Sequence, residues 1–420
     1  MPPIMSANPR VIIVGAGLAG LACARHLSQA GLGCSLLDAS DAVGGRVRTD
    51  RVDGFQLDRG FQVFLTGYPE AGRMLDYPAL QLQPFHPGAM VRYAGGFHRI
   101  SDPLRRPQDL LSTMMSPIGS FGDKLKVLRL RRDALRRQLC GQAGGGERTT
   151  LEALQVYGFS PAMQQRFFLP FLSGVFLDQA LSTPCRLFEL VWAAFSRGDI
   201  ALPQQGMGAI ASQLAATLPT ESIRLNAAVS HLDGTTAVLA SGERLAADVL
   251  VLATDDATAA TLRGDSRPAA PGRDAICLYF DAPAPPVRGP WLILNGDGQG
   301  PVGTACVLSE VAQGYAPLGL SLISVSLSGQ PSLAGGDLQQ AVCRQLREWF
   351  GEEVHVWRHL RTDHIKRALP PIEILTAQAS GASPRVRPGL YQCGDYCETG
   401  TLDGALLSGR KAAEALLADH

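Results

Sequence analysis

The sequence has no surplus of charge of either sign: 38 lysines and arginines balance 38 aspartates and glutamates over 420 residues. A protein whose main partner is nucleic acid needs a basic excess to neutralise phosphates, so this balance argues against that class. The chain also lacks an apolar run long enough to span a bilayer, and residues 1–9 lack the apolar core of a signal peptide. We therefore expect a cytoplasmic protein that binds no nucleic acid.

Cysteine and histidine are present, but not in metal-binding patterns. The nine cysteines include no C-x-x-C pair, so the sequence indicates neither a zinc site nor a disulfide framework, and we expect reduced thiols. His355, His359 and His364 are close in sequence, but the alternation in Val354–Trp357 predicts a strand. Histidines four residues apart on a strand stand roughly 13 Å apart, too far to share one ion. No metal site is predicted.

The chain is organised around a glycine-rich turn between an apolar strand and a helix. Val11–Val14 lead into Gly15-Ala16-Gly17-Leu18-Ala19-Gly20, and a helical pattern of small residues follows. In a G-x-G-x-x-G pattern the first glycine allows the tight turn, the second lets the backbone approach a pyrophosphate, and the third permits close helix packing. The second apolar strand, Cys34–Leu37, ends in Asp38, where an acid should bind a ribose hydroxyl. This arrangement predicts a dinucleotide site at the helix N-terminus.

The loop after Asp38 favours one class of dinucleotide enzyme. Gly44 and Gly45 can approach the same phosphates, and Arg46 can bond phosphate oxygens, while Asp58 and Gly60 form a D-x-G pattern further on. This order of motifs resembles the FAD-binding superfamily of flavin-containing amine oxidoreductases, which includes amine oxidases, phytoene desaturases and protoporphyrinogen oxidases. Glutamate is the commoner ribose-binding acid in that family, so Asp38 is a departure from its pattern.

A second motif lies at the far end of the chain. An apolar strand, Leu390–Cys393, precedes Gly394-Asp395, and a helix rich in small residues begins near Leu402. This resembles the C-terminal FAD motif of the same superfamily, which implies that Asp395 holds the ribityl or phosphate region and that the helix start at Thr401 faces the flavin. A helix N-terminus there stabilises negative charge on reduced flavin. The two motifs together favour FAD over NAD, bound without a covalent link.

The resemblance implies an α/β fold in which segments far apart in sequence form one domain. We expect a Rossmann-like FAD-binding domain from residues 1–75, 200–264 and 386–420, and an α+β substrate domain, with a mixed sheet and a helical part, from 76–199 and 265–385. Val249–Ala253 is the last buried strand of the first domain, and the backbone of Val229 is expected to meet the adenine. The predicted cofactor-binding residues are Gly15, Gly17, Leu18, Ala19, Gly20, Asp38, Gly44, Gly45, Arg46, Gly60, Phe61, Val229, Gly394, Asp395, Thr401 and Leu402.

The substrate domain contains a long aromatic and apolar stretch that resembles a P-F-x-S-G-V segment of protoporphyrinogen oxidases and desaturases. Its large aromatic residues are Phe167, Phe168, Phe171, Phe176, Phe188, Trp192 and Phe195. Amine oxidases of the superfamily often carry a lysine near flavin N5 and an aromatic residue before the C-terminal helix. Here the corresponding strand has Ile276, Cys277 and Tyr279 but no lysine, and Thr401 takes the aromatic position.

We therefore predict oxidation or dehydrogenation of a lipophilic substrate, isoprenoid or tetrapyrrole, by hydride transfer to flavin N5. Amine oxidation and a flavin-dependent isomerisation without net redox change are the alternatives, and a flavin-binding protein without catalysis is a further one. No residue stands out as a general base. The catalytic residues, the electron acceptor and the oligomeric state stay open.

One predicted helix carries an unusual charge. Asp123–Leu139 has seven basic residues and two acidic ones along an amphipathic pattern. A solvated surface helix is the ordinary interpretation. Peripheral contact with an anionic membrane is the alternative, because basic amphipathic helices lie on such surfaces.

Overall fold

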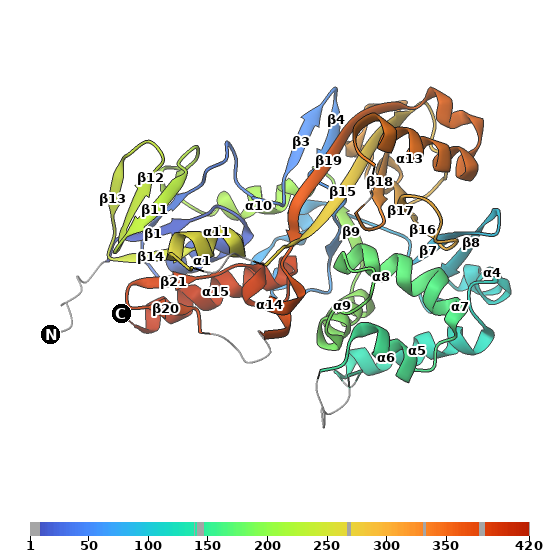
Figure 1. The fold of residues 1–420 in the computed structure, drawn as a ribbon, viewed down its shortest axis with the longest axis horizontal. Helices are drawn as coiled ribbons and strands as arrows, with labels where there is room; N and C mark the ends of the chain where they lie inside the picture. The colour runs from blue at the N-terminus through green and yellow to red at the C-terminus, as the bar shows by residue number, and fades with distance from the viewer. Residues whose placement is uncertain are drawn as a thin grey trace.

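The computed structural model describes residues 9–137, 139–140, 147–266, 270–330, 333–377 and 383–419. Two large sheets lie toward opposite ends of the molecule, and the long strands β15 and β19 of the second sheet extend toward the first (Figure 1). Helices pack against both sheets, and a separate group of helices, α4 to α9, lies beside the second sheet. The mixed α/β fold class is confirmed.

The first sheet has six strands and is parallel except at one edge. Its order is β10 (Ile223–Arg224), β2 (Cys34–Leu37), β1 (Val11–Val14), β14 (Val249–Leu252), β21 (Leu390–Gln392) and β20 (Arg385–Arg387), with β20 antiparallel. Val14 pairs with Leu37 on one side and with Leu252 on the other. Both β1 and β14 are buried along their whole length, because helices cover one face of the sheet and a helix together with a small antiparallel sheet covers the other. The chain therefore returns twice, from distant segments, to complete the sheet that β1 begins.

Two helices cover one face of this sheet at very close range. α1 (Leu18–Gln29) packs along α15 (Leu402–Ala418), and a Cβ atom placed on Gly409 would lie 2.2 Å from the carbonyl oxygen of Ala19. Small residues on both helices thus let the first and last helices of the chain touch backbone to backbone. The rest of this half comprises α10 (Gly208–Ala215), α11 (Asp256–Arg263) and the small sheet β11 (Val229–Asp233), β12 (Thr236–Leu239) and β13 (Arg244–Ala246).

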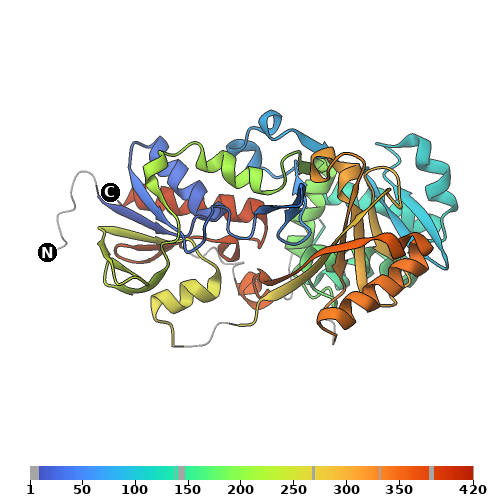
Figure 2. The same cartoon turned by 90° about the horizontal axis from the view of Figure 1, so that it is seen from above.

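The second sheet is mixed and has seven strands. Its order is β19 (Arg358–Leu369), β15 (Arg273–Ala282), β18 (Ser321–Leu327), β17 (Val302–Val307), β16 (Leu292–Asn295), β7 (Gly88–Tyr93) and β8 (Gly96–Ser101), and only β16 and β7 pair in parallel. The apolar face of α13 (Gly335–Phe350) packs against it through Leu338, Val342 and Leu346. Figure 2 shows this sheet and α13 from above.

Shorter strands connect the two halves. These are the hairpin β3 (Thr49–Val52) and β4 (Phe55–Asp58), and the three-stranded sheet β5 (Phe64–Leu65), β9 (Ile200–Pro203) and β6 (Leu82–Pro84). Short helices also lie in these connections: α2 (Ala71–Met74), α3 (Tyr77–Leu80), α12 (Leu308–Val311) and α14 (Ile372–Ala377).

The helical group consists of α4 (Leu110–Met115), α5 (Phe121–Leu135), α6 (Thr150–Val156), α7 (Pro161–Met163), α8 (Leu169–Phe176) and α9 (Cys185–Arg197). A capping box of Thr149 and Glu152 starts α6, and Ser160 caps α7 ahead of Pro161. The basic helix α5 begins earlier than predicted, because Ser120 caps it through a capping box with Asp123. It also ends sooner than predicted, at Leu135.

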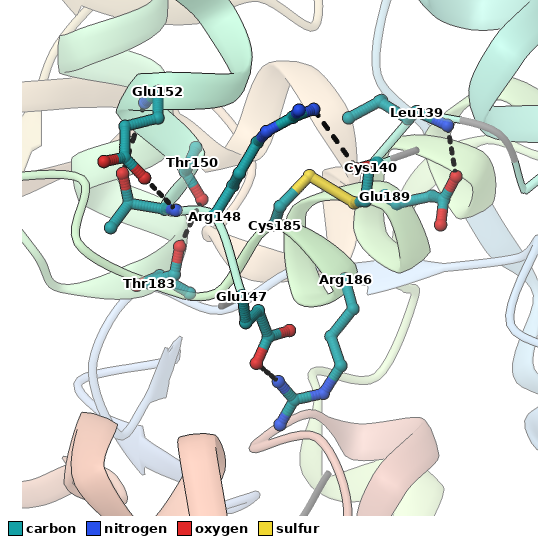
Figure 3. The surroundings of a disulfide bond; sticks show 11 residues. Leu139, Cys140, Glu147, Arg148, Thr150, Glu152, Thr183, Cys185, Arg186 and Glu189 are labelled. Carbon is teal, nitrogen blue, oxygen red and sulfur yellow. Dashed lines mark hydrogen bonds and ion pairs between the residues drawn. A yellow bond between two sulfur atoms is a disulfide. The ribbon is translucent and has the colours of Figure 1, made fainter. Parts of the chain in front are cut away.

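The cysteine prediction is wrong at one place. Cys140 and Cys185 form a disulfide across 45 residues, with their Cα atoms 5.8 Å apart (Figure 3). The start of α9 brings Cys185 to Cys140, and in the same view Leu139 donates its N–H to Glu189. Disulfides persist mainly in oxidising compartments. The expectation of reduced thiols therefore no longer supports a cytoplasmic location.

The strand predicted at Val354–Trp357 is also wrong: Glu352–Val356 form a short 3₁₀ helix, and β19 begins at Arg358. In the described parts of the chain, no three histidine, cysteine, aspartate or glutamate side chains gather in a way that could hold a metal ion. Nor does any helix there combine the length and apolar character needed to cross a bilayer.

Candidate functional site

The carboxyl ends of β1, β2 and β14 open onto a cavity of about 710 Å³ that continues to the second sheet. Val14, Leu37 and Ala253 line it at these strand ends. In open α/β sheets, ligands bind at the carboxyl ends of the strands, at the point where the order of the strands reverses. The volume lies within the range of about 300–1,000 Å³ that is usual for small-molecule and cofactor sites.

The N-terminus of α1 points its unused backbone donors at this cavity. The N-cap is Gly17, so no side chain caps the first N–H groups of the helix. The first turn also contains no acidic residue. Leu18 and Ala19 line the cavity. A Cβ atom placed on Gly17 would meet no protein atom within 4 Å, so the space beside its backbone is open. These features suit a diphosphate, which needs free N–H groups and an approach without a side chain.

The loop after β2 closes the cavity beside Gly17. Gly44 donates its N–H to the Ala16 carbonyl at 2.8 Å and pairs with Gly17 in an isolated bridge. Gly45 has a φ of +59°, and a Cβ atom there would stand 3.5 Å from the Gly17 Cα. Asp38 accepts hydrogen bonds from the N–H groups of Ala16 at 2.7 Å and Ser40 at 2.8 Å. A carboxylate has about four acceptor positions, so Asp38 retains capacity for ribose hydroxyls.

Arg46 joins the first motif to the last. Its Nη2 donates to Asp395 Oδ1 at 2.6 Å, and its Nη1 donates to the carbonyl oxygen of Ala368 at 3.0 Å. The Arg46 side chain is still 35% exposed, and both residues line the cavity. Contact of Arg46 with phosphate oxygens stays a prediction. In the structure this arginine links β19 and the C-terminal motif to the glycine loop.

The C-terminal helix presents its N-terminus to the same cavity. Thr401 caps α15 by accepting the N–H of Gly404 at 3.0 Å, and both Thr401 and Leu402 line the cavity. Asp403 points away from it and accepts the N–H groups of Glu70 and Ala71. The cavity therefore receives two helix N-termini, one from each end of the chain.

The predicted site residues are brought together, with one exception. Gly20 does not line the cavity; a Cβ atom there would lie 1.9 Å from the Gly15 carbonyl oxygen. Its place is at the contact between α1 and the glycine turn. The predicted residues that do line the cavity are Gly15, Gly17, Leu18, Ala19, Asp38, Gly44, Gly45, Arg46, Gly60, Phe61, Val229, Gly394, Asp395, Thr401 and Leu402.

The sequence did not predict the basic residues that β15 and β19 contribute to the cavity wall. Arg273 lines the cavity at the start of β15 and donates from Nε to the Pro370 carbonyl at 2.9 Å; burial lowers the pKa of Arg273 to about 10. Lys366 and Arg367 line it where the pairing of β19 with β15 shifts register, and Arg367 has a φ of +52°. A bulge of this kind re-aims side chains and has no marker in the sequence.

The aromatic stretch divides between the cavity and the core. Phe171, Phe176 and Phe195 line the cavity, whereas Phe168 and Phe188 are completely buried in the hydrophobic core. Ile276 and Cys277 line it from β15. Tyr279, on the same strand, does not; its hydroxyl donates to the Asp58 carbonyl oxygen at 2.8 Å. The cavity is therefore largely apolar where α8 and α9 line it.

Asp58 of the D-x-G pattern is a buried connection between the two halves. Its carboxylate accepts hydrogen bonds from Thr49 Oγ1, from the Tyr315 hydroxyl at 2.7 Å and from the Met207 N–H at 2.9 Å. Burial raises the pKa of Asp58 from 3.8 to about 6, against the opposing effect of the hydrogen bonds from Thr49 and Tyr315. In the D-x-G motif, Asp58 therefore has a structural role, and Gly60 lines the cavity.

We expect Asp58 to make the folded protein less stable as the pH rises. Because folding raises this pKa, the contribution is fully present below pH 3.8 and is lost as the pH rises through about 6. Ionisation should lower the free energy of unfolding by roughly 2–3 kcal/mol. Asp58→Asn should remove that part of the pH dependence in urea unfolding at about pH 4 and about pH 8. Asp337→Asn, at an exposed position, is the matched control, and equal slopes for wild type and Asp58→Asn would contradict the assignment.

Comparison with known proteins places the site in context. A family model described as flavin containing amine oxidoreductase matches residues 18–417. Protoporphyrinogen oxidase 2 of Arabidopsis thaliana is 32% identical over 120 residues, which are 28% of this chain and 23% of that protein. 4,4'-Diapolycopene oxygenase of Methylomonas sp is 39% identical over 84 residues, 18% of this chain and 16% of that protein. Probable polyamine oxidase 4 of Arabidopsis thaliana is 43% identical over 53 residues, 13% of this chain and 11% of that protein.

The chain thus matches less than a quarter of the length of these curated relatives. A solved structure is similar over the full length: a putative protoporphyrinogen oxidase from Exiguobacterium sp. 255-15, with a TM-score of 0.72 and 18% identity, covering 99% of this chain and 100% of that one. At this identity the likeness shows the shared fold.

Proposed function

The chain belongs to the flavin containing amine oxidoreductase family, and on that premise we propose that it is an FAD-dependent oxidoreductase that oxidises or dehydrogenates a lipophilic substrate. The observation that carries the substrate class is the charge of the cavity wall. Among the described lining residues from 76–199 and 265–385 there is no carboxylate, whereas Arg273 and Lys366 are basic, as is Arg367, which is paired with Asp256. A cationic amine would meet like charge there, so the wall disfavours amines.

The apolar lining supports the same proposal. Phe171, Phe176 and Phe195 face the cavity beside Leu187 and Val191. Removing hydrocarbon from water yields about 0.8 kcal/mol per CH₂, so a long isoprenoid or a tetrapyrrole gains binding energy without any specific polar contact. Thr401 stands where an aromatic residue would flank an amine, and its hydroxyl is used to cap α15.

Two helix N-termini, the glycine loop and Asp38 are the features that would hold FAD. A bound flavin would supply the acceptor for electrons taken from a substrate C–H bond. The start of α15 would favour the negative charge that reduction creates. The phenylalanines and leucines of the wall would exclude water and orient the hydrocarbon.

We further propose that the FAD is not covalently linked. Of the described cysteines, Cys277 is the one that lines the cavity, and burial raises the pKa of its thiol, which is hydrogen-bonded to Ser324. Cys393 and Cys397 do not line it, and burial raises the pKa of Cys397 to about 12. Acid precipitation of the yellow protein should leave all flavin in the supernatant, and colour in the pellet would contradict this.

The substrate class can be tested without oxygen. We expect the flavin absorbance of the oxidised enzyme to bleach when polyenes or tetrapyrroles are added anaerobically, and to stay unchanged with simple amines and polyamines. Rapid bleaching by an amine, with none by the lipophilic panel, would overturn the proposal in favour of an amine oxidase. Conversion of a lipophilic substrate without bleaching would instead indicate an isomerase.

A further inference from the structure

Six exposed large apolar side chains gather in one short stretch of the chain. They lie before α4, on α4 and on the first turns of α5, and each is between 45% and 76% exposed. We call them the α4–α5 patch: Leu104, Leu110, Leu111, Met115, Phe121 and Leu125. In Figure 1, α4 and α5 lie at the end of the molecule remote from β1. Exposed large apolar side chains concentrated in one region mark an interaction site.

The patch is held in place by buried polar contacts on its other side. Thr113 of α4 is buried, and its Oγ1 accepts the N–H of Ser101 on β8 at 3.1 Å. Buried Lys124 donates to the carbonyl oxygens of Met114 at 2.9 Å and Ser116 at 2.8 Å, which ties α5 to the end of α4. The apolar side chains are therefore presented outward by anchored helices.

The outer face of α5 continues the patch with positive charge. Phe121, Leu125, Arg129, Arg132 and the C-cap Arg136 are all exposed. At about 100° per residue, these five positions fall within roughly 80° of one another around the helix. The stripe is thus apolar in its first half and basic in its second.

Little negative charge balances these arginines. Arg129 and Arg132 share one buried carboxylate, Asp133, at 3.5 Å and 2.9 Å. In the described part of the chain, the side chain of Arg136 makes no hydrogen bond or ion pair; its backbone N–H donates to the Arg132 carbonyl oxygen at 3.2 Å. Because the whole protein carries no net charge, the stripe is a local basic feature and not a reflection of a basic protein.

We propose that the α4–α5 patch docks on an anionic lipid bilayer, with its apolar side chains among the acyl chains and the α5 arginines on the headgroups. Apolar insertion beside basic residues is the combination that holds proteins at such an interface. A second copy of this chain fits less well, because a symmetric contact would bring two arginine stripes close together. This goes beyond the proposed oxidoreductase, and it would place the enzyme where lipophilic molecules dissolve.

The test is co-sedimentation of the flavoprotein with vesicles, without substrate. Wild type should bind vesicles of phosphatidylcholine and phosphatidylglycerol at low salt, less at high salt, and hardly bind phosphatidylcholine alone. The double variants Leu111→Ser with Met115→Ser, and Arg132→Glu with Arg136→Glu, should each bind roughly tenfold more weakly or worse. Leu318→Ser and Arg387→Glu, at exposed positions outside the patch, should bind like wild type.

Flavin content and melting temperature are measured on every variant, to check that the substitutions leave the fold intact. Absence of wild-type binding at low salt, or undiminished binding by both double variants, would overturn the proposal. So would a wild-type dimer in solution that the Leu111→Ser and Met115→Ser variant converts to monomer, since the patch would then bind a second copy. None of these readouts depends on which substrate the enzyme oxidises.

Discussion

Replacement of Gly17 by valine should yield a folded protein that is colourless. Gly17 has a φ of −72°, which valine adopts readily, and a Cβ atom there meets no protein atom within 4 Å. The new side chain would therefore cost the apoprotein little and would stand beside the free N–H groups of α1. Those groups are where the pyrophosphate is expected. The flavin-to-protein ratio should fall to roughly one tenth of the wild-type value or less.

The control for Gly17→Val is the same substitution at a glycine that lies away from the cavity and has equally open space around it. Gly33 is exposed, and a Cβ atom there also meets nothing within 4 Å, so Gly33→Val should retain its flavin. The far-ultraviolet circular dichroism of both variants should match wild type. Full flavin occupancy in Gly17→Val would show that the pyrophosphate lies elsewhere.

Replacement of Gly20 by valine should, in contrast, prevent stable folding. A Cβ atom on Gly20 would lie 1.9 Å from the Gly15 carbonyl oxygen and 3.2 Å from the Ala253 Cβ. The obstacle is backbone on the glycine turn, so no rotation of a side chain relieves it. We expect the free energy of unfolding to fall by at least about 3 kcal/mol, with loss of soluble protein.

Gly17→Val is the matched control, since the two positions are three residues apart on the same turn. Soluble yield and thermal unfolding separate the two outcomes: one variant is stable without flavin, and the other is unstable whether or not flavin is added. A stable, flavin-free Gly20→Val protein would mean that this glycine contacts the cofactor instead of packing the helix.

Local patterns predicted the nucleotide half of the molecule well. The strand Val11–Val14, the helix starting at Leu18 and the second strand Cys34–Leu37 lie where the sequence placed them. The C-terminal helix begins at Leu402, as expected. These elements are specified by apolar runs, glycines and caps within a few residues of one another, which is the information that periodicity and capping rules use.

The features that the sequence did not reveal depend on residues far apart. Asp58 meets Tyr315 across 257 residues, and Cys140 meets Cys185 only because α9 is placed beside it. Val354–Trp357 alternate like a strand, yet they form a helical turn that follows α13. Arg367 reaches the cavity wall through a register shift. In each case the deciding contact is tertiary, and a local pattern carries no record of it.

The position of β1 in its sheet has a consequence for the order of events during synthesis. β1 is synthesised before its neighbour β14, the next strand β21 and the helix α15, which all follow it by more than 230 residues. Because domains generally fold as units during translation, the glycine turn must wait until these later segments have been made. The nascent chain therefore cannot assemble both halves of its nucleotide site before α15 is synthesised, and a product truncated ahead of α15 should have no means of retaining the cofactor.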